Sequence, residues 1–218
     1  MSGLTGALAY PLSGPATERP LVACWTLVLL AVFVPFLPLI PLAGYLVRVL
    51  VASVRGDPAP RLLEGARSLL AAGVVAWGLL VVYLALPAAL LLVTVQGALA
   101  REGTQASLPT IGIMYAGSTA VLLLSMAGAY LWPLAVAEYS QAGSVRAAFD
   151  WSAFRRPATH GGYFVWWIVG AAALAVALAL AVRTAAVPRI GPVIAGLLAA
   201  YGALLAFHLW GRAIARTL

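Results

Sequence analysis

Charged side chains are scarce in this sequence, and lysine is absent from it. Only 9% of the 218 residues are charged, whereas 64% are hydrophobic and the mean hydropathy is +1.02. A soluble domain carries about 25% charged and about 45–50% apolar residues, so the deficit excludes an ordinary soluble fold. The apolar residues form continuous runs rather than alternating segments of about ten residues, which excludes a transmembrane β-barrel. The composition predicts an all-α fold, a polytopic transmembrane helical bundle.

Residues that carry chemistry are few as well. The single cysteine, Cys24, cannot form an internal disulfide. The two histidines, His160 and His208, do not stand at a metal-ligand spacing. The sequence also lacks a Walker loop, a GxGxxG motif and a GxSxG motif. We therefore predict no catalytic residues, no metal site and no cofactor, and we expect that the protein is not an enzyme.

The apolar runs predict about five membrane spans, at 21–51, 69–95, 111–136, 163–182 and 192–210. A span needs about 20 residues, so the first run is too long for one straight helix. It contains Pro35, Pro38 and Pro41, which break helical hydrogen bonding. Two arrangements fit this run: a single kinked span, or a re-entrant hairpin with the prolines at its tip.

Two polar stretches interrupt the apolar runs, and we call them the arginine islands. The first covers 44–73 and the second covers 137–162. Each island is predicted to hold one short interfacial helix, at about 61–70 and about 145–156. We expect Ser144 to cap the second of these helices and Pro157 to stop it.

The distribution of arginine predicts how the chain is threaded. With five spans, nine arginines lie on the side of both islands and the C-terminus, and four lie on the other side. Cytoplasmic loops carry the excess of positive charge, so both islands and the C-terminus are predicted to be cytoplasmic in a multi-pass protein of the cell membrane. With a re-entrant first segment the count becomes ten against three. The two counts differ by one arginine, and the side of the N-terminus stays open.

The predicted partners are membrane lipids, and a second copy or another membrane protein can pack on the spans. The net charge is +7, yet the arginines flank apolar spans, so no nucleic-acid partner is expected. Arginines of the islands are candidates for contacts with lipid or protein: Arg48, Arg55, Arg146, Arg155 and Arg156. Glu138 and His208 are candidates for a polar intramembrane site, although a solvated helix end and an interface position are the simpler interpretations.

The fourth span carries small residues at a spacing of four: Ala171, Ala175 and Ala179. Such a face allows another helix to approach closely, so we expect it to pack within the monomer or between copies.

Three short motifs resemble a known family. They are Ala9-Tyr10-Pro11, GYLVRVL at 44–50 followed by a Gly-Asp turn, and SVRAAFD at 144–150. Together they resemble the polytopic archaeal membrane family catalogued as domain of unknown function 4013, over nearly the whole chain. The stretch at 58–65 lacks the aromatic residue associated with the family there. The resemblance implies no activity, so it assigns no functional residue.

Two functional hypotheses follow from these patterns. The first is a non-enzymatic membrane protein that organises lipid or docks partner proteins, because its arginines lie on surface segments and its spans hold no buried charge. The alternative is a small transporter or channel subunit with its site at the proline-broken first segment, since discontinuous helices often mark substrate sites.

Overall fold

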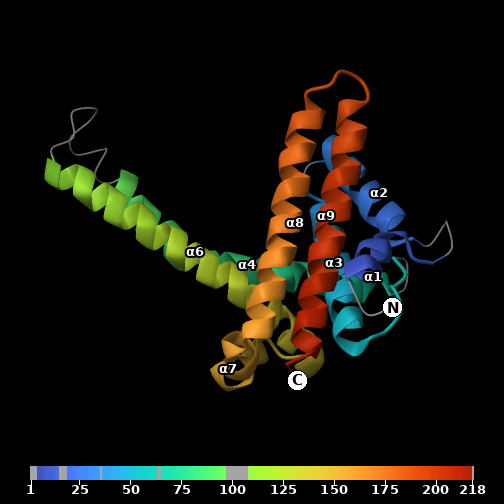
Figure 1. Ribbon diagram of the computed structural model, residues 1–218, viewed down its shortest axis with the longest axis horizontal. Helices are drawn as coiled ribbons and strands as arrows, with labels where there is room; N and C mark the ends of the chain where they lie inside the picture. Colours follow the sequence, from blue (N-terminus) through green and yellow to red (C-terminus); the bar gives the residue numbers. More distant parts are fainter. Residues whose placement is uncertain (1–3, 15–18, 35, 63–64, 97–107, 218) are drawn as a thin grey trace. The chain divides into compact units, whose positions relative to one another are not determined.

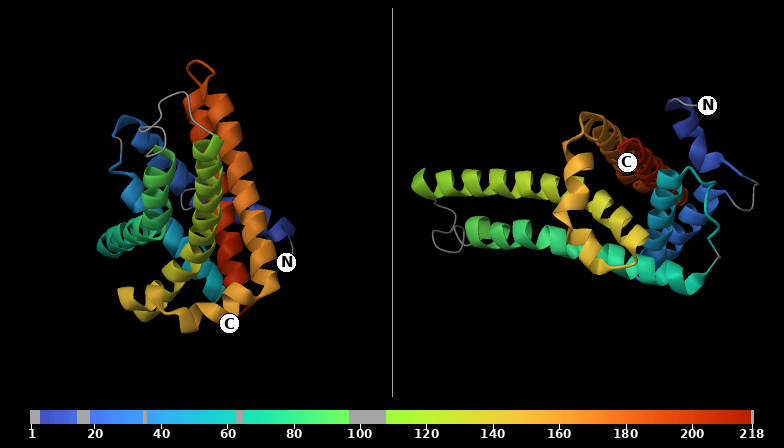
Figure 2. Two further views of the ribbon diagram at one scale, coloured as in Figure 1. Left: turned by 90° about the vertical axis from the view of Figure 1, so that its left-hand side faces the viewer. Right: turned by 90° about the horizontal axis from the view of Figure 1, so that it is seen from below.

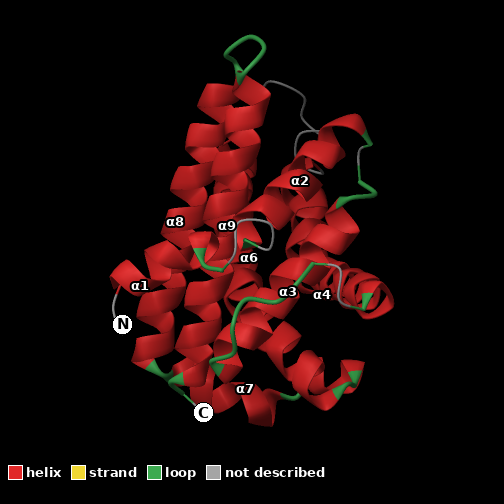
Figure 3. Ribbon diagram, turned by 90° about the vertical axis from the view of Figure 1, so that its right-hand side faces the viewer, coloured by secondary structure: helices red, strands yellow, loops and turns green. Residues whose placement is uncertain are grey.

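The computed structural model describes residues 4–14, 19–34, 36–62, 65–96 and 108–217. All regular structure within these residues is helical, which confirms the predicted fold class (Figure 3). The elements are α1 (Leu4–Ala9), η1 (Tyr10–Leu12), α2 (Pro20–Phe33), α3 (Leu39–Arg55), α4 (Ala66–Leu91), the π-helical turn η3 (Leu92–Gln96), α6 (Leu108–Ala142), η4 (Val145–Phe149), α7 (Trp151–Thr159), α8 (Gly161–Ala185) and α9 (Gly191–Ala215).

Four helices are long and apolar enough to cross a membrane. They cover Ala66–Thr94, Pro109–Ala142, Gly161–Ala185 and Gly191–Ala215, and each overlaps one of the last four predicted spans. The chain divides into two compact units. Unit 1 comprises Met1–Trp77 and Pro133–Leu218, and unit 2 comprises Gly78–Trp132.

Unit 2 pairs the second part of α4 with the first part of α6, and the two helices lie side by side (Figure 2). Glycine permits the close approach: Gly117 lies against the Thr94 side chain, and a Cβ added to Gly128 would lie 3.0 Å from the Tyr83 carbonyl oxygen. Large apolar side chains such as Val81 remain exposed. Apolar surface of this kind is typical of helices that face lipid.

In unit 1, α8 and α9 lie side by side (Figure 1). Trp210 Nε1 donates a hydrogen bond of 3.1 Å to the Trp167 carbonyl. Gly170 leaves room for the Trp210 ring, and Gly202 lies against the Cβ of Ala177. Small residues thus allow the two helices to pack closely, as the composition of membrane helices predicts.

The face predicted for this packing is the wrong one within the monomer. Ala175 and Ala179 are exposed, whereas Ala177 and Ala181 are buried. The reason is that Gly170 and Ala177, seven residues apart on one face, stand opposite Trp210 and Gly202 of α9. Packing of the 171, 175 and 179 face between copies stays a prediction.

The first hydrophobic segment forms two short helices instead of one span. The helices α2, with 14 residues, and α3, with 17 residues, are separate, and Phe36 between them has a φ of 69°. η1, which precedes α2, and the end of α3 both reach the same residue of α9: Tyr10 stacks on His208, and Ser53 hydrogen-bonds to it. Because both ends of the segment return to one level of α9, α2 and α3 form a hairpin (Figures 1 and 3).

The interfacial helix predicted at 61–70 is not observed. Residues 61, 62 and 65 lie outside helices and α4 begins at Ala66, while 63–64 are outside the described residues. Side chains of α3 hold this stretch instead: Tyr45 donates to the Pro60 carbonyl at 3.1 Å, and Arg48 donates to the Gly65 carbonyl at 2.8 Å. Gly65 has a φ of +61°, a conformation that a continuing helix does not contain.

The helix predicted at 145–156 is two elements, η4 and α7, separated at Asp150. Asp150 Oδ1 accepts hydrogen bonds from Ser152 N at 2.9 Å and from Ser152 Oγ at 2.6 Å, so Asp150 caps α7. These hydrogen bonds from Ser152, with help from the charge of Arg146, lower the pKa of Asp150. Pro157 lies inside α7 and does not end it.

Candidate functional site

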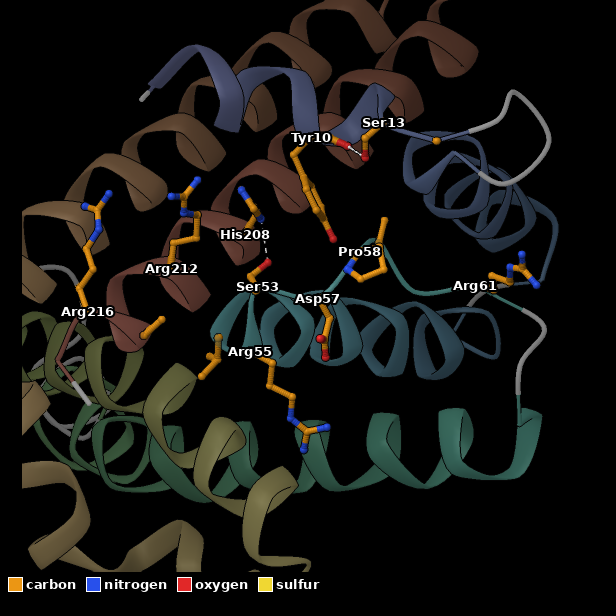
Figure 4. A pocket seen from close by; sticks show the side chains of 15 residues that line it. Tyr10, Ser13, Ser53, Arg55, Asp57, Pro58, Arg61, His208, Arg212 and Arg216 are labelled. Atoms are coloured by element: carbon orange, nitrogen blue, oxygen red, sulfur yellow. Dashed lines mark hydrogen bonds between the residues drawn. The ribbon is translucent and has the colours of Figure 1, made fainter. Parts of the chain in front are cut away.

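A cleft of about 820 Å³ opens in unit 1 between η1, the end of α3 and the end of α9 (Figure 4). We call it the arginine cleft. Its volume is within the range of ligand-binding clefts, about 300–1,000 Å³. Its polar lining residues are Tyr10, Ser13, Ser53, Arg55, Asp57, Arg61, His208, Arg212 and Arg216.

Ser53 and His208 form the floor of the arginine cleft. Ser53 Oγ and His208 Nδ1 share a hydrogen bond of 2.7 Å, and both residues are buried. The helices α3 and α9 approach closely here because residue 211 is glycine: an added Cβ would meet the Leu50 carbonyl oxygen and would lie 2.6 Å from Ser53 Cβ. A polar contact of this kind holds two apolar helices in one register.

Tyr10 covers this pair from the N-terminal segment. Its ring stacks on the His208 imidazole, with the centroids 3.9 Å apart and the planes at 11° (Figure 4). The Tyr10 hydroxyl is buried and has no hydrogen-bond partner among the described residues. Burial raises the pKa of Tyr10 to about 12, and a hydrogen bond from the Ser53 side chain to the charged form opposes the rise, so the hydroxyl stays protonated at neutral pH. Leaving such a hydroxyl without a partner costs about 1–3 kcal/mol.

The mouth of the arginine cleft is positively charged. Four arginines line it against one carboxylate, that of Asp57. Arg55 lies in the last turn of α3 and Arg212 in the last turn of α9, where a cation interacts favourably with the helix dipole. Neither of these two arginines makes an ion pair within the described part of the chain. The guanidinium of Arg216 lies 5.0 Å from the centre of the Trp166 ring.

The structure brings two of the predicted site residues together and separates the others. Arg55 and His208 both line the arginine cleft. Arg48 is held by the Gly65 carbonyl and by Ser68 Oγ, at 2.8 and 2.7 Å, so its contacts are within the protein. The remaining predicted residues lie outside the cleft: Glu138 half-buried in α6, and Arg146, Arg155 and Arg156 exposed on η4 and α7.

Sequence reasoning missed most of the cleft. Tyr10 belongs to the Ala9-Tyr10-Pro11 motif, which was a signal without an assigned role. Arg212 and Arg216 entered only the count of charges on each side. Ser53 carries no signal in the sequence, because nothing there indicates that α3 and α9 meet at this serine.

The Ser53–His208 hydrogen bond also has the form of a nucleophile beside a base. In a catalytic pair of this type a third group usually orients the histidine. Here the imidazole stacks on Tyr10, and its hydrogen bond with Ser53 joins α9 to α3. Within the described residues, no group of three or more His, Cys, Asp or Glu side chains is placed to hold a metal ion.

Comparison with known proteins adds a family to this geometry. The family model described as "Protein of unknown function (DUF4013)" matches residues 27–187, more than half of the chain. The chain belongs to this family. The match confirms the resemblance to this family; the motifs at 44–50 and 144–150 lie within the matched residues, and Ala9-Tyr10-Pro11 lies outside them. No curated protein and no solved structure matches the chain.

The DUF4013 match covers only part of the arginine cleft. Ser53, Arg55 and Asp57 lie within the matched residues, whereas Tyr10, His208 and Arg212 lie outside them. The cleft therefore joins a matched segment, the end of α3, to the two ends of the chain.

Proposed function

We propose that this DUF4013 protein is a non-enzymatic membrane protein that binds the anionic headgroup of a lipid in the arginine cleft and thereby organises lipid around unit 1. The observation that carries the proposal is the lining of the cleft, which includes four arginines and one carboxylate. Guanidinium groups bind phosphate oxygens through paired hydrogen bonds, so a cluster of arginines is suited to a phosphate group.

The position of the cleft supports a lipid as its occupant. Arg55 and Arg212 end two helices that are largely apolar before them, α3 and α9. Arginines at the ends of apolar helices lie at the level of the lipid headgroups, and the cytoplasmic surface of a membrane is negatively charged. A headgroup phosphate can therefore reach the cleft directly from the bilayer.

The transport alternative placed its site at the break in the first segment. The described side chains there are large, apolar and exposed: Phe33 is 82% exposed, Phe36 79% and Leu37 67%. The polar groups gather at the other end of α3 instead, in the arginine cleft. This distribution favours headgroup binding over a substrate site at the break.

The test is a comparison of two double variants that remove the same charge. Arg55→Gln with Arg212→Gln alters the arginine cleft, and Arg183→Gln with Arg189→Gln alters the opposite end of the α8–α9 pair. Native mass spectrometry of the purified protein, titrated with phosphatidylglycerol, gives the lipid affinity of each. Each arginine near an anionic surface contributes about 1 kcal/mol, so the cleft variant should bind roughly thirtyfold more weakly.

The control variant should bind with nearly unchanged affinity. Equal weakening in both variants would mean that binding follows net charge, and the cleft would then have no special role. Added salt should weaken the wild-type interaction, since it screens exposed charges.

A further inference from the structure

We infer that the arginine cleft selects a polyol phosphate, with the phosphate at the arginines and a ligand hydroxyl against Tyr10 and Ser53. This inference rests on the proposed function and specifies its ligand. Two sources share this chemistry: a headgroup such as that of phosphatidylglycerol, and a soluble glycerol phosphate. The juxtaposition that carries the inference is a buried hydroxyl without a partner on the floor of a cleft with a cationic mouth.

The floor offers hydrogen bonds but no formal charge apart from the titratable histidine. Ser53 already shares its hydrogen bond with His208, yet its oxygen keeps lone pairs that can accept another. The Tyr10 hydroxyl is buried and, within the described residues, makes no hydrogen bond, so it can donate one. The Tyr10 hydroxyl as donor and the Ser53 oxygen as acceptor together match an alcohol group, which both accepts and donates a hydrogen bond.

The same floor disfavours other anionic ligands. Inorganic phosphate or a bare phosphate ester held at the arginines brings no alcohol group to the floor, and a buried hydroxyl such as that of Tyr10 is costly without a partner. A ligand that carries a hydroxyl close to its phosphate satisfies both ends at once. Discrimination of this type is strong when a site is built to hydrogen-bond a ligand hydroxyl.

Tyr10 is the residue that separates this inference from the proposed function. Tyr10→Phe removes the hydroxyl and keeps the ring that stacks on His208. Tyr201→Phe is the matched control: the Tyr201 hydroxyl donates to the Leu8 carbonyl at 2.9 Å and does not line the cleft. Both substitutions remove one tyrosine hydroxyl at the N-terminal segment, and a thermal melt of each variant reports any loss of folding.

The measurement uses the full chain in phosphatidylcholine nanodiscs with either phosphatidylglycerol or phosphatidic acid at the same mole fraction. Wild type should retain phosphatidylglycerol preferentially, although phosphatidic acid carries at least as much charge. Tyr10→Phe should reduce phosphatidylglycerol binding roughly fivefold and leave phosphatidic acid unchanged, which is the effect of one hydrogen bond. Tyr201→Phe should keep the wild-type preference.

Glycerol 3-phosphate and inorganic phosphate, added as soluble competitors, distinguish the two sources. If glycerol 3-phosphate displaces phosphatidylglycerol and inorganic phosphate does not, the natural ligand of the cleft is the soluble ester. If neither competitor displaces phosphatidylglycerol, the ligand is the lipid. Both results support a polyol phosphate as the ligand. Equal retention of the two lipids in wild type, or no effect of Tyr10→Phe, overturns the inference. If Arg212→Gln still weakens the binding of both lipids in that case, the proposed function stands. If Arg212→Gln does not weaken their binding, the inference and the proposed function both fail.

Discussion

At the residue scale, the absence of a side chain at Gly211 decides whether the arginine cleft exists. The Ser53–His208 hydrogen bond requires α3 and α9 to approach closely, and an added Cβ at 211 would lie 2.6 Å from Ser53 Cβ. Because the obstructing atoms include the backbone carbonyl of Leu50, a rotamer change cannot relieve the clash. The two helices would have to separate, and the hydrogen bond between them would lengthen.

Gly211→Ala should therefore destabilise unit 1 by about 1–3 kcal/mol through overpacking. Gly78→Ala is the control, since nothing lies within 4 Å of a Cβ added there and the position is inside α4. In an open helical position alanine should stabilise by about 0.5–1 kcal/mol. Denaturant unfolding in detergent micelles, followed by tryptophan fluorescence, measures both changes. Opposite signs are expected, and a stabilising effect at 211 would contradict the close approach of α3 and α9.

The sequence allowed only part of this site to be predicted. His208 and Arg55 were identified by type and position, because a histidine or an arginine is rare among apolar residues. Ser53 and Tyr10 could not be identified in that way. Their roles arise from contacts between segments about 155 and 198 residues away from His208 in the chain, and no local pattern encodes such contacts.

At the element scale, the long helices were predictable and the short ones were not. Each of the four long apolar helices has a continuous run that no other fold explains. The short segments depend on individual side-chain contacts. Arg48 of α3 binds the Gly65 carbonyl just before α4. Asp150 follows η4 and caps the start of α7. Local amphipathic periodicity cannot report either contact, so both predicted interfacial helices were wrong in their limits.

The packing of α8 gives the prediction at this scale. Ala177 is buried against Gly202 of α9, whereas Ala175, two residues earlier, is exposed. Ala177→Leu should destabilise the protein by about 1–3 kcal/mol, since the extra volume has to separate the two helices. Ala175→Leu should leave the melting temperature of the monomer unchanged.

Thermal melts of both variants in detergent measure the difference, and size-exclusion chromatography with light scattering reports assembly. If the 171, 175 and 179 face packs between copies, Ala175→Leu should shift the protein toward monomer without changing the stability of each chain. Equal destabilisation by the two substitutions would contradict the observed register of α8 on α9.

At the scale of the whole molecule, the folding of unit 1 groups the arginines by the end of the helix pair on which they lie. The C-terminal end of α9 meets the start of α8, through Arg216 over Trp166 and Trp210 on Trp167. The end of α3 joins them at His208. Arg183 and Arg189 lie at the opposite end, in and beside the α8–α9 turn. The predicted threading assigns Arg183 and Arg189 to the side opposite that of the cleft arginines.

The folding of unit 1 also predicts the side of the membrane that each end of the helix pair faces. The positive-inside rule puts the end that holds Arg55, Arg212 and Arg216 in the cytoplasm. Because α2 and α3 form a hairpin, η1 lies at that same end, and the segment before α2 should be cytoplasmic too. Ser53 is buried against His208 and is unsuitable as a reporter, whereas Ser13, Asp57 and Ser152 are exposed.

Single cysteines at these three positions, in a Cys24→Ala background, should stay unlabelled by an impermeant thiol reagent in intact cells and react once the cells are opened. A cysteine at Ala186, exposed in the α8–α9 turn, should be labelled from outside in intact cells. Labelling of the Asp57 or Ser152 position from outside would reverse the threading. Labelling of the Ser13 position alone would leave both arginine islands inside. It would also show that the first segment crosses the membrane, because the two ends of a hairpin that does not cross lie on the same side.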